Sequence, residues 1–210
     1  MTPYQKHFAK WKDCELCPLH SQRHRIVLAR GKVPADVVLI GEGPGESEDA
    51  LGSPFVGPAG RQLNHIVERA FPGHMELAED GWTEHWICDV RCAFTNLVAC
   101  FPRNAKKTAS HEPEPAEVKA CSPRLVEFVR MCKPKLIVRV GKLASKYVYG
   151  QAQFSIRKDH SLEWLPRNQF LHFVDMVHPA AILRAPLANR GLMVQKAVVV
   201  LSEALEEALK

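Results

Sequence analysis

Two hydrophobic patterns alternate along the chain. The first is a short, nearly continuous apolar run bounded by proline, glycine or polar residues, typical of a buried strand. Such runs predict strands at residues 33–41, 93–98, 134–141 and 170–179. The second pattern places apolar residues at i, i+3 and i+4, as on one face of a helix. It predicts helices at residues 2–12, 58–71, 115–131, 142–149 and 191–209.

The alternation of strands and helices predicts an α/β fold. We expect a three-layer α/β/α arrangement around a central, mostly parallel four-stranded sheet, with ligands binding at the carboxyl ends of the strands. A chain of 210 residues that is 46% hydrophobic suffices for one substantial core, so we predict one domain over residues 1–210. The segments 72–92 and 101–117 are rich in proline, glycine and charge, and are longer than ordinary connections.

Composition narrows the function only slightly. The 28 Lys and Arg residues against 23 Asp and Glu give a net charge of +5, which permits a polyanionic partner without requiring one. The first residues contain no apolar core of signal-peptide length, and no apolar run reaches the length of a membrane span. We therefore expect a soluble, cytoplasmic protein that makes no membrane contact and is a monomer.

The cysteines fall into candidate ligands and other thiols. An odd count of seven without a secretory signal argues against a disulfide framework. Cys14 and Cys17 form a C-x-x-C pair ahead of the first predicted strand, whereas a thioredoxin-type pair follows a strand. Cys100 and Cys121 flank the charged 101–117 segment and are the best candidates for two further ligands. The spacing leaves zinc and an iron-sulfur cluster open.

Three cysteines remain outside this set. We interpret Cys88, Cys92 and Cys132 as buried or weakly reactive thiols, the usual state of a free cysteine. Cys88 and Cys92 also form an alternative ligand pair.

Polar residues stand at the carboxyl ends of three predicted strands. They are Glu42, Asn96 and His178, and Phe55 lies in the loop that follows the first strand. Singly, each has a structural explanation: Asn96 as a cap, His178 as a hydrogen-bonded core histidine, and Phe55 as a core side chain. Together they predict a small pocket with an aromatic wall and an amide that reads the edge of a planar ligand.

Five sequence blocks, in order, resemble the family 4 uracil-DNA glycosylases, the iron-sulfur branch of the uracil-DNA glycosylase superfamily. The blocks are GEGPGESEDALGSPFVGPAGRQLN, TNLVAC, the AC-x-P at Cys121, KPKLIVRVGKLA and HPAAILR. The resemblance implies a monofunctional DNA-repair enzyme. Such an enzyme flips uracil out of single- or double-stranded DNA and hydrolyses its N-glycosidic bond, leaving an abasic site. It also implies a structural 4Fe-4S cluster with the ligands Cys14, Cys17, Cys100 and Cys121.

The resemblance assigns roles to the residues of the predicted pocket. Phe55 would stack on the extruded base, and Asn96 would form hydrogen bonds along the uracil edge. His178 would donate to the carbonyl oxygen on which negative charge builds. Glu48 would lie near the five-position of the ring, where the methyl group of thymine would clash.

The acidic loop 41–49 would complete this pocket. Gly41, Gly43 and Glu42 would line its floor beside the sugar, and we expect the acidic residues of the loop to face the sugar and the rim of the base. Arg184, after the last block, would approach the DNA.

The 101–117 segment departs from the family pattern and carries the alternatives. Lys106 and Lys107 are expected to contact phosphates. A related branch of the superfamily has an insertion here whose histidine attacks the sugar and stays bound to DNA. We interpret His111 as a solvated loop residue and keep covalent trapping as the alternative. A third hypothesis is a non-catalytic iron-sulfur module that binds nucleic acid.

Overall fold

The computed structural model describes most of the chain. The described residues are 1–71, 74–77, 84–87, 90–103, 110–148 and 171–210, with backbone alone in 74–77 and 84–87. Lys106 and Lys107 therefore lie outside the described residues, as do Cys88 and much of the 72–92 segment.

A five-stranded sheet forms the centre of the molecule. Its strands stand in the order β1 (Ala29–Gly31), β5 (Cys92–Asn96), β2 (Val37–Gly41), β6 (Leu136–Val140) and β7 (His172–Met176). The last four are parallel and are the four predicted strands, which confirms a mostly parallel sheet. The predicted strand count was wrong by one, because β1 adds an antiparallel edge strand beside β5. Its three residues are too short to show a hydrophobic pattern.

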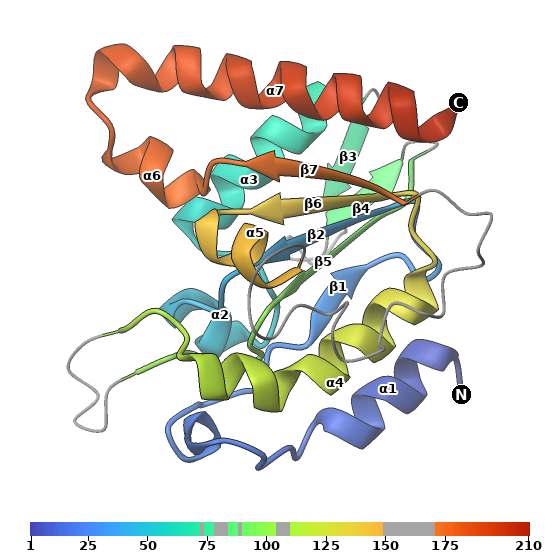
Figure 1. The fold of residues 1–210 in the computed structure, drawn as a ribbon, viewed down its shortest axis with the longest axis vertical. Coiled ribbons are helices and arrows are strands. Elements are labelled where there is room, and N and C mark those ends of the chain that lie inside the picture. Colours follow the sequence, from blue (N-terminus) through green and yellow to red (C-terminus); the bar gives the residue numbers. More distant parts are fainter. Residues whose placement is uncertain (72–73, 78–83, 88–89, 104–109, 149–170) are drawn as a thin grey trace.

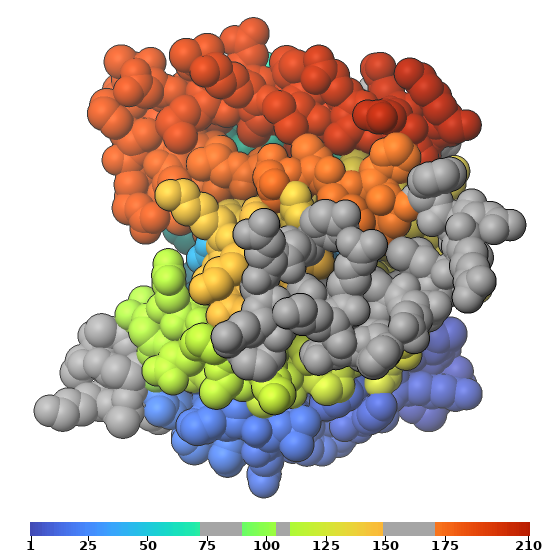
Figure 2. Space-filling view, viewed as in Figure 1, coloured from blue at the N-terminus to red at the C-terminus, as the bar shows by residue number. Residues whose placement is uncertain are grey.

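Helices cover both faces of this sheet, as the sequence predicts (Figure 1). One face carries α3 (Pro58–Ala70), α6 (Pro179–Arg184) and α7 (Leu187–Leu209), and the other carries α4 (Pro115–Cys132) and α5 (Lys142–Val148). The first helix, α1 (Pro3–Trp11), packs on α4. Figure 2 shows the N-terminal residues forming the flank of the molecule next to α4. None of the helices in the described ranges combines the length and apolar character needed to cross a membrane.

Besides β1 and α6, three short features were not predicted. They are the 3-10 helix η1 (Pro18–Ser21), the helix α2 (Glu46–Leu51) within the acidic loop, and an antiparallel hairpin of β3 (His74–Leu77) and β4 (Glu84–Ile87). Only the hairpin lies in the segment for which the sequence predicts no role.

Strand β2 shows why the sheet is covered on both sides. All five of its residues are buried, and alternate side chains enter different cores. Val38 and Ile40 pack into the core beneath α4, whereas Val37 and Leu39 pack into the core beneath α3 and α7. A strand buried on both faces reads as an unbroken apolar run, which is the pattern in the sequence.

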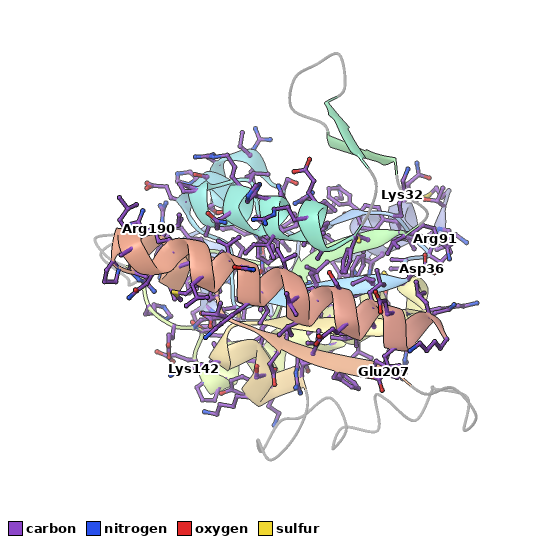
Figure 3. The ribbon with its side chains drawn as sticks, turned by 90° about the horizontal axis from the view of Figure 1, so that it is seen from above. Lys32, Asp36, Arg91, Lys142, Arg190 and Glu207 are labelled. Atoms are coloured by element: carbon purple, nitrogen blue, oxygen red, sulfur yellow. The ribbon has the colours of Figure 1, made fainter. Side chains whose placement is uncertain are left out.

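An ion pair joins the amino ends of two central strands. The Arg91 guanidinium binds Asp36 in a bidentate manner, with Nη2 to Oδ1 at 2.9 Å and Nε to Oδ2 at 3.0 Å. Hydrogen bonding from Arg91 lowers the pKa of Asp36 below its ordinary value. Figure 3 shows the pair at the opposite end of the sheet from Lys142, which follows β6. The pair thus fixes the strands at the end remote from their carboxyl termini.

Candidate functional site

The carboxyl ends of three parallel strands meet at one cavity of about 500 Å³. Glu42 follows β2, Asn96 ends β5, and His178 follows β7, and all three line the cavity together with Phe55. The structure therefore brings together the phenyl ring, carboxamide, imidazole and carboxylate that the sequence places at separate strand ends. The volume suffices for a planar ring of nucleobase size.

Asn96 presents its side-chain amide to the cavity. The residue is only 2% exposed, and its side chain forms no hydrogen bond with the part of the chain that the structure describes. Its backbone carbonyl accepts a hydrogen bond of 2.6 Å from Arg124 Nη2. Because the amide lines an open cavity, its donor and its acceptor are available to a ligand that enters it.

Phe55 reaches the cavity because Gly41 leaves room for it. The Phe55 backbone is in the left-handed region, with φ of 58°, and its ring packs edge-on against Phe94 at a centroid distance of 6.1 Å. A Cβ atom at Gly41 would lie 2.6 Å from Phe55 Cζ and 2.5 Å from Asn96 Oδ1. The absence of a side chain at Gly41 therefore lets the ring and the amide approach the same strand end.

His178 is held as a neutral donor. The Ala180 backbone N–H donates to its Nδ1 at 3.2 Å, so the proton of the neutral ring is on Nε2. Burial is the main cause that lowers the pKa of His178, and Arg184 lowers it further while Glu42 opposes the shift. Gly141 has φ of +95°, and a Cβ there would lie 2.6 Å from Glu42 Oε1 and 3.2 Å from the His178 side chain. The sequence interpretation missed Gly141, although its position after β6 is also a strand end.

Glu48 lines the cavity and holds its wall. One carboxylate oxygen accepts from Val56 N at 2.9 Å and from Gly57 N at 2.7 Å, and the other accepts from Gly45 N at 3.1 Å. These bonds fix the turn that carries Phe55. The role of Glu48 near the five-position of a base remains a prediction, since its oxygens already serve the backbone.

The other two carboxylates of α2, Glu46 and Asp49, are not among the residues that line the cavity, so the prediction that they face it was wrong. Asp49 is fully buried and accepts from both His24 N, at 3.0 Å, and His24 Nδ1, at 2.6 Å. It therefore anchors the N-terminal segment. The Glu46 side chain is 87% exposed. Hydrogen bonds from backbone N–H groups explain two of the four acidic residues of this loop, Glu48 and Asp49. Sequence spacing does not reveal such contacts.

Two further predicted residues also line the cavity. They are Gly43 and Arg184, of which Arg184 is exposed. His111 also lines the cavity, with only 30% of its side chain exposed, so its position differs from that of a solvated loop residue. His111 Nδ1 donates to the Glu112 carbonyl oxygen at 2.7 Å, which leaves the lone pair on Nε2 when the ring is neutral.

A second cavity lies between the N-terminal segment and α4. It is lined by all four predicted ligands, which are Cys14, Cys17, Cys100 and Cys121. Among the described residues, no three His, Cys, Asp or Glu side chains converge closely enough to hold a single metal ion. The four thiols therefore surround a space instead of meeting at a point.

Two guanidinium groups contact these cysteines. Arg23 Nη1 lies 3.3 Å from Cys100 Sγ, and Arg124 Nη2 lies 3.6 Å from Cys121 Sγ. Burial raises the pKa of the Cys100 thiol to about 11 despite the nearby Arg23. The cavity thus combines sulfur ligands with cations that stabilise negative charge. The sequence interpretation missed both arginines.

The other described cysteines lie apart from this cavity. Cys92 is buried at the start of β5, and Cys132 is buried at the end of α4, where burial raises the pKa of its thiol to about 12. Both match the interpretation as buried thiols.

Comparison with known proteins identifies one family. The model of the Uracil DNA glycosylase superfamily matches residues 28–202. A Type-4 uracil-DNA glycosylase of Pyrobaculum aerophilum is 33% identical over 188 residues, covering 86% of this chain and 84% of the relative. The enzyme of the same name from Sulfurisphaera tokodaii is 32% identical over 179 residues, covering 83% and 73%. That of Thermotoga maritima is 30% identical over 175 residues, covering 82% and 79%.

Proposed function

Because the chain belongs to the uracil-DNA glycosylase superfamily and is similar to its type-4 enzymes, we propose that it removes uracil from DNA. The reaction is hydrolysis of the N-glycosidic bond, which leaves an abasic site. The observation that carries this proposal is the buried, unpartnered amide of Asn96, which shares a cavity with Phe55 and His178.

This constellation suits the recognition of an extruded uracil. A base inside a duplex is unreachable, and flipping it out costs a few kcal/mol, which stacking on Phe55 and edge contacts with Asn96 offset. The amide has a donor and an acceptor, and one fixed orientation matches the edge of uracil but mismatches that of cytosine.

The catalytic roles follow from how charge moves in the reaction. When the bond between the sugar C1′ and uracil N1 breaks, its electron pair leaves with the base and the sugar acquires oxocarbenium character. His178 Nε2–H donates to the uracil oxygen that gains negative charge, and the Glu42 carboxylate stabilises the sugar cation. A water molecule then adds to C1′. None of the described residues that line the cavity is a lysine, which agrees with a monofunctional enzyme.

The four cysteines suit a 4Fe-4S cluster. All four cysteines line one cavity, as a shared site requires, and the resemblance to family 4 favours the cluster over a zinc ion. Arg23 and Arg124 supply positive charge beside the sulfurs. Such a cluster would be structural, joining the N-terminal segment and the start of the loop after β5 to α4.

DNA is the partner that these features favour. Arg184 stands at the mouth of the base cavity, where a phosphate next to an extruded nucleotide would lie. The net charge of +5 favours a polyanion. We assign Lys106 and Lys107 to phosphate contacts, and we expect the protein to act as a monomer.

The decisive experiment is a panel of oligonucleotides containing uracil, thymine or cytosine at one position. The protein is incubated with each, and abasic sites are cleaved with alkali. We expect uracil-dependent cleavage alone, and a decrease in kcat/KM of about 10²–10³-fold in Asn96→Ala because a base contact is lost. If no base is released and DNA binding is unchanged in Asn96→Ala, the protein is instead a non-catalytic binding module.

His111 supports a second candidate function, covalent trapping, because it lines the same cavity with a free Nε2 lone pair. In that reaction Nε2 forms a bond to C1′ while uracil leaves with the electron pair of the broken bond. A denaturation-resistant complex with DNA that disappears in His111→Ala identifies this reaction. Free uracil released over many turnovers excludes it.

A further inference from the structure

Arg124 is a buried cation in α4. The residue is 1% exposed, and no carboxylate within the described part of the chain forms an ion pair with it. Placing an isolated charge in the interior is costly unless dipoles or an opposite charge compensate it. The groups that surround Arg124 therefore indicate why a charge is kept there.

On one side, the guanidinium binds the end of β5. Nη2 donates to the carbonyl oxygens of Asn96 at 2.6 Å and Leu97 at 3.1 Å, and Nη1 donates to Thr95 Oγ1 at 2.7 Å. These contacts hold the Thr95 side chain and the backbone that directly follows the Asn96 side chain. Leu97 N in turn donates to the carbonyl of Gly41 at 2.9 Å, so the same clamp joins the ends of β5 and β2.

On the other side, the guanidinium faces the cysteine cavity. Arg124 follows Cys121 by one helical turn of α4, and Nη2 lies 3.6 Å from its Sγ. Four thiolates around an iron-sulfur core leave a net negative charge, and positive groups next to the sulfurs stabilise that charge. The cluster would thus supply the negative charge that no carboxylate in the described part of the chain provides to Arg124.

We propose that Arg124 is a positioning residue that couples the cysteine-bound cluster to the base-reading end of β5. The negative charge of the cluster holds the guanidinium, and the guanidinium holds the carbonyls that orient Asn96. This inference rests on the proposed function and deepens it, because the cluster then contributes to the geometry of base recognition besides joining chain segments.

Arg23 provides the matched control. It also contacts the cysteines, with Nη1 at 3.3 Å from Cys100 Sγ and at 2.7 Å from the Cys14 carbonyl oxygen, but it does not touch β5. Removing either cation from the sulfurs disfavours the more negative state of the cluster, so Arg23→Gln and Arg124→Gln should both lower its midpoint potential. Only Arg124→Gln also releases the end of β5.

The experiment compares the two variants in cluster-loaded protein by three measurements. These are the midpoint potential of the cluster, hydrogen exchange at the amides of Leu97 and Val98, and kcat for uracil release. We expect lower potentials in both variants. Arg124→Gln should also show faster exchange at the two amides and a kcat at least about tenfold below that of Arg23→Gln, because misplaced groups lose rate steeply.

Arg124→Lys keeps the experiment decisive if Arg124→Gln does not fold. Lysine preserves the charge but lacks the planar fork that contacts both sides, so it should retain a potential near that of the unmodified protein and still lose kcat. Equal exchange and equal kcat in the Arg23 and Arg124 variants overturn the coupling, as does an unchanged potential in Arg124→Gln. If the unmodified protein releases no uracil, the proposed function fails, while potential and exchange still test the coupling.

Discussion

Substitution of Gly41 by alanine tests the geometry of the base cavity most directly. Gly41 is outside the left-handed region, so alanine can adopt its backbone conformation. The new Cβ would lie 2.5 Å from Asn96 Oδ1 and 2.6 Å from Phe55 Cζ, whereas ordinary contacts begin near 3.4 Å. Both groups must therefore move by roughly 1 Å, and a displacement of that size costs about 10²-fold in rate.

The assay separates this loss of geometry from a loss of folding. We expect kcat/KM of Gly41→Ala for a uracil-containing oligonucleotide to fall about 10²-fold. The overpacking should cost about 1–3 kcal/mol, so the melting temperature decreases by several degrees and the protein remains folded. Gly191→Ala is the matched control, because a Cβ there meets nothing within 4 Å in the exposed part of α7. It should retain full activity and slightly gain stability.

A kcat/KM within about threefold of the unmodified enzyme in folded Gly41→Ala would refute the reasoning, since a real misplacement of both groups costs far more. Phe55 and Asn96 would then not act on the base from these positions.

Two further predictions concern pH. Protonation of His178 places a second proton on Nδ1, which breaks the hydrogen bond that Nδ1 accepts from Ala180 N and releases the ring from its position. Its pKa lies below the ordinary 6.5, so kcat should stay constant through pH 6.5 and decrease only below the lowered pKa. A rate profile measures this, and His178→Gln should lack that acid limb; a limb unchanged in the variant would assign it to another group. Asp36 has a lowered pKa, so its pair with Arg91 stabilises the fold above pH 3.8, and this contribution is lost as pH falls through the lowered value. Asp36→Asn should reduce the free energy of unfolding by about 0.5–1 kcal/mol at neutral pH, because the pair is partly exposed. Urea unfolding at neutral and acidic pH measures it, and a difference that persists below the lowered pKa would contradict this explanation.

The sequence predicts the elements whose patterns are long enough to repeat. Unbroken apolar runs identify β2, β5, β6 and β7, and helical periodicity identifies α3 and α4. The edge strand β1 has only three residues, and α2 has six within a loop that reads as acidic and glycine-rich. The structure of such short elements depends on tertiary contacts, such as the pairing of Ala29 with Thr95. Their sequences therefore show no periodic hydrophobic pattern.

The candidate site was predictable to the extent that it depends on topology. Parallel strands end at the same edge of the sheet, so polar residues after them must gather, and Asn96 and His178 do so. The supporting contacts were not predictable in this way. An arginine in an amphipathic helix, such as Arg124, normally lies in solvent, and only coordinates reveal that it is buried against β5. The catalytic roles of Asn96 and His178 remain predictions.

The groups around the cavity are each fixed through backbone contacts. Arg124 binds the carbonyl of Asn96, the Ala180 N–H binds His178, and Glu48 binds the turn that carries Phe55. The side-chain amide oxygen and nitrogen of Asn96 form no hydrogen bond within the described part of the chain. The backbone contacts hold these side chains in place, and the Asn96 amide stays available to the base. Such an arrangement stabilises a bound transition state, because the protein need not reorganise when charge develops. A matching base forms hydrogen bonds with the amide, whereas a mismatched base excludes water and leaves the amide unpaired, which costs about 1–3 kcal/mol.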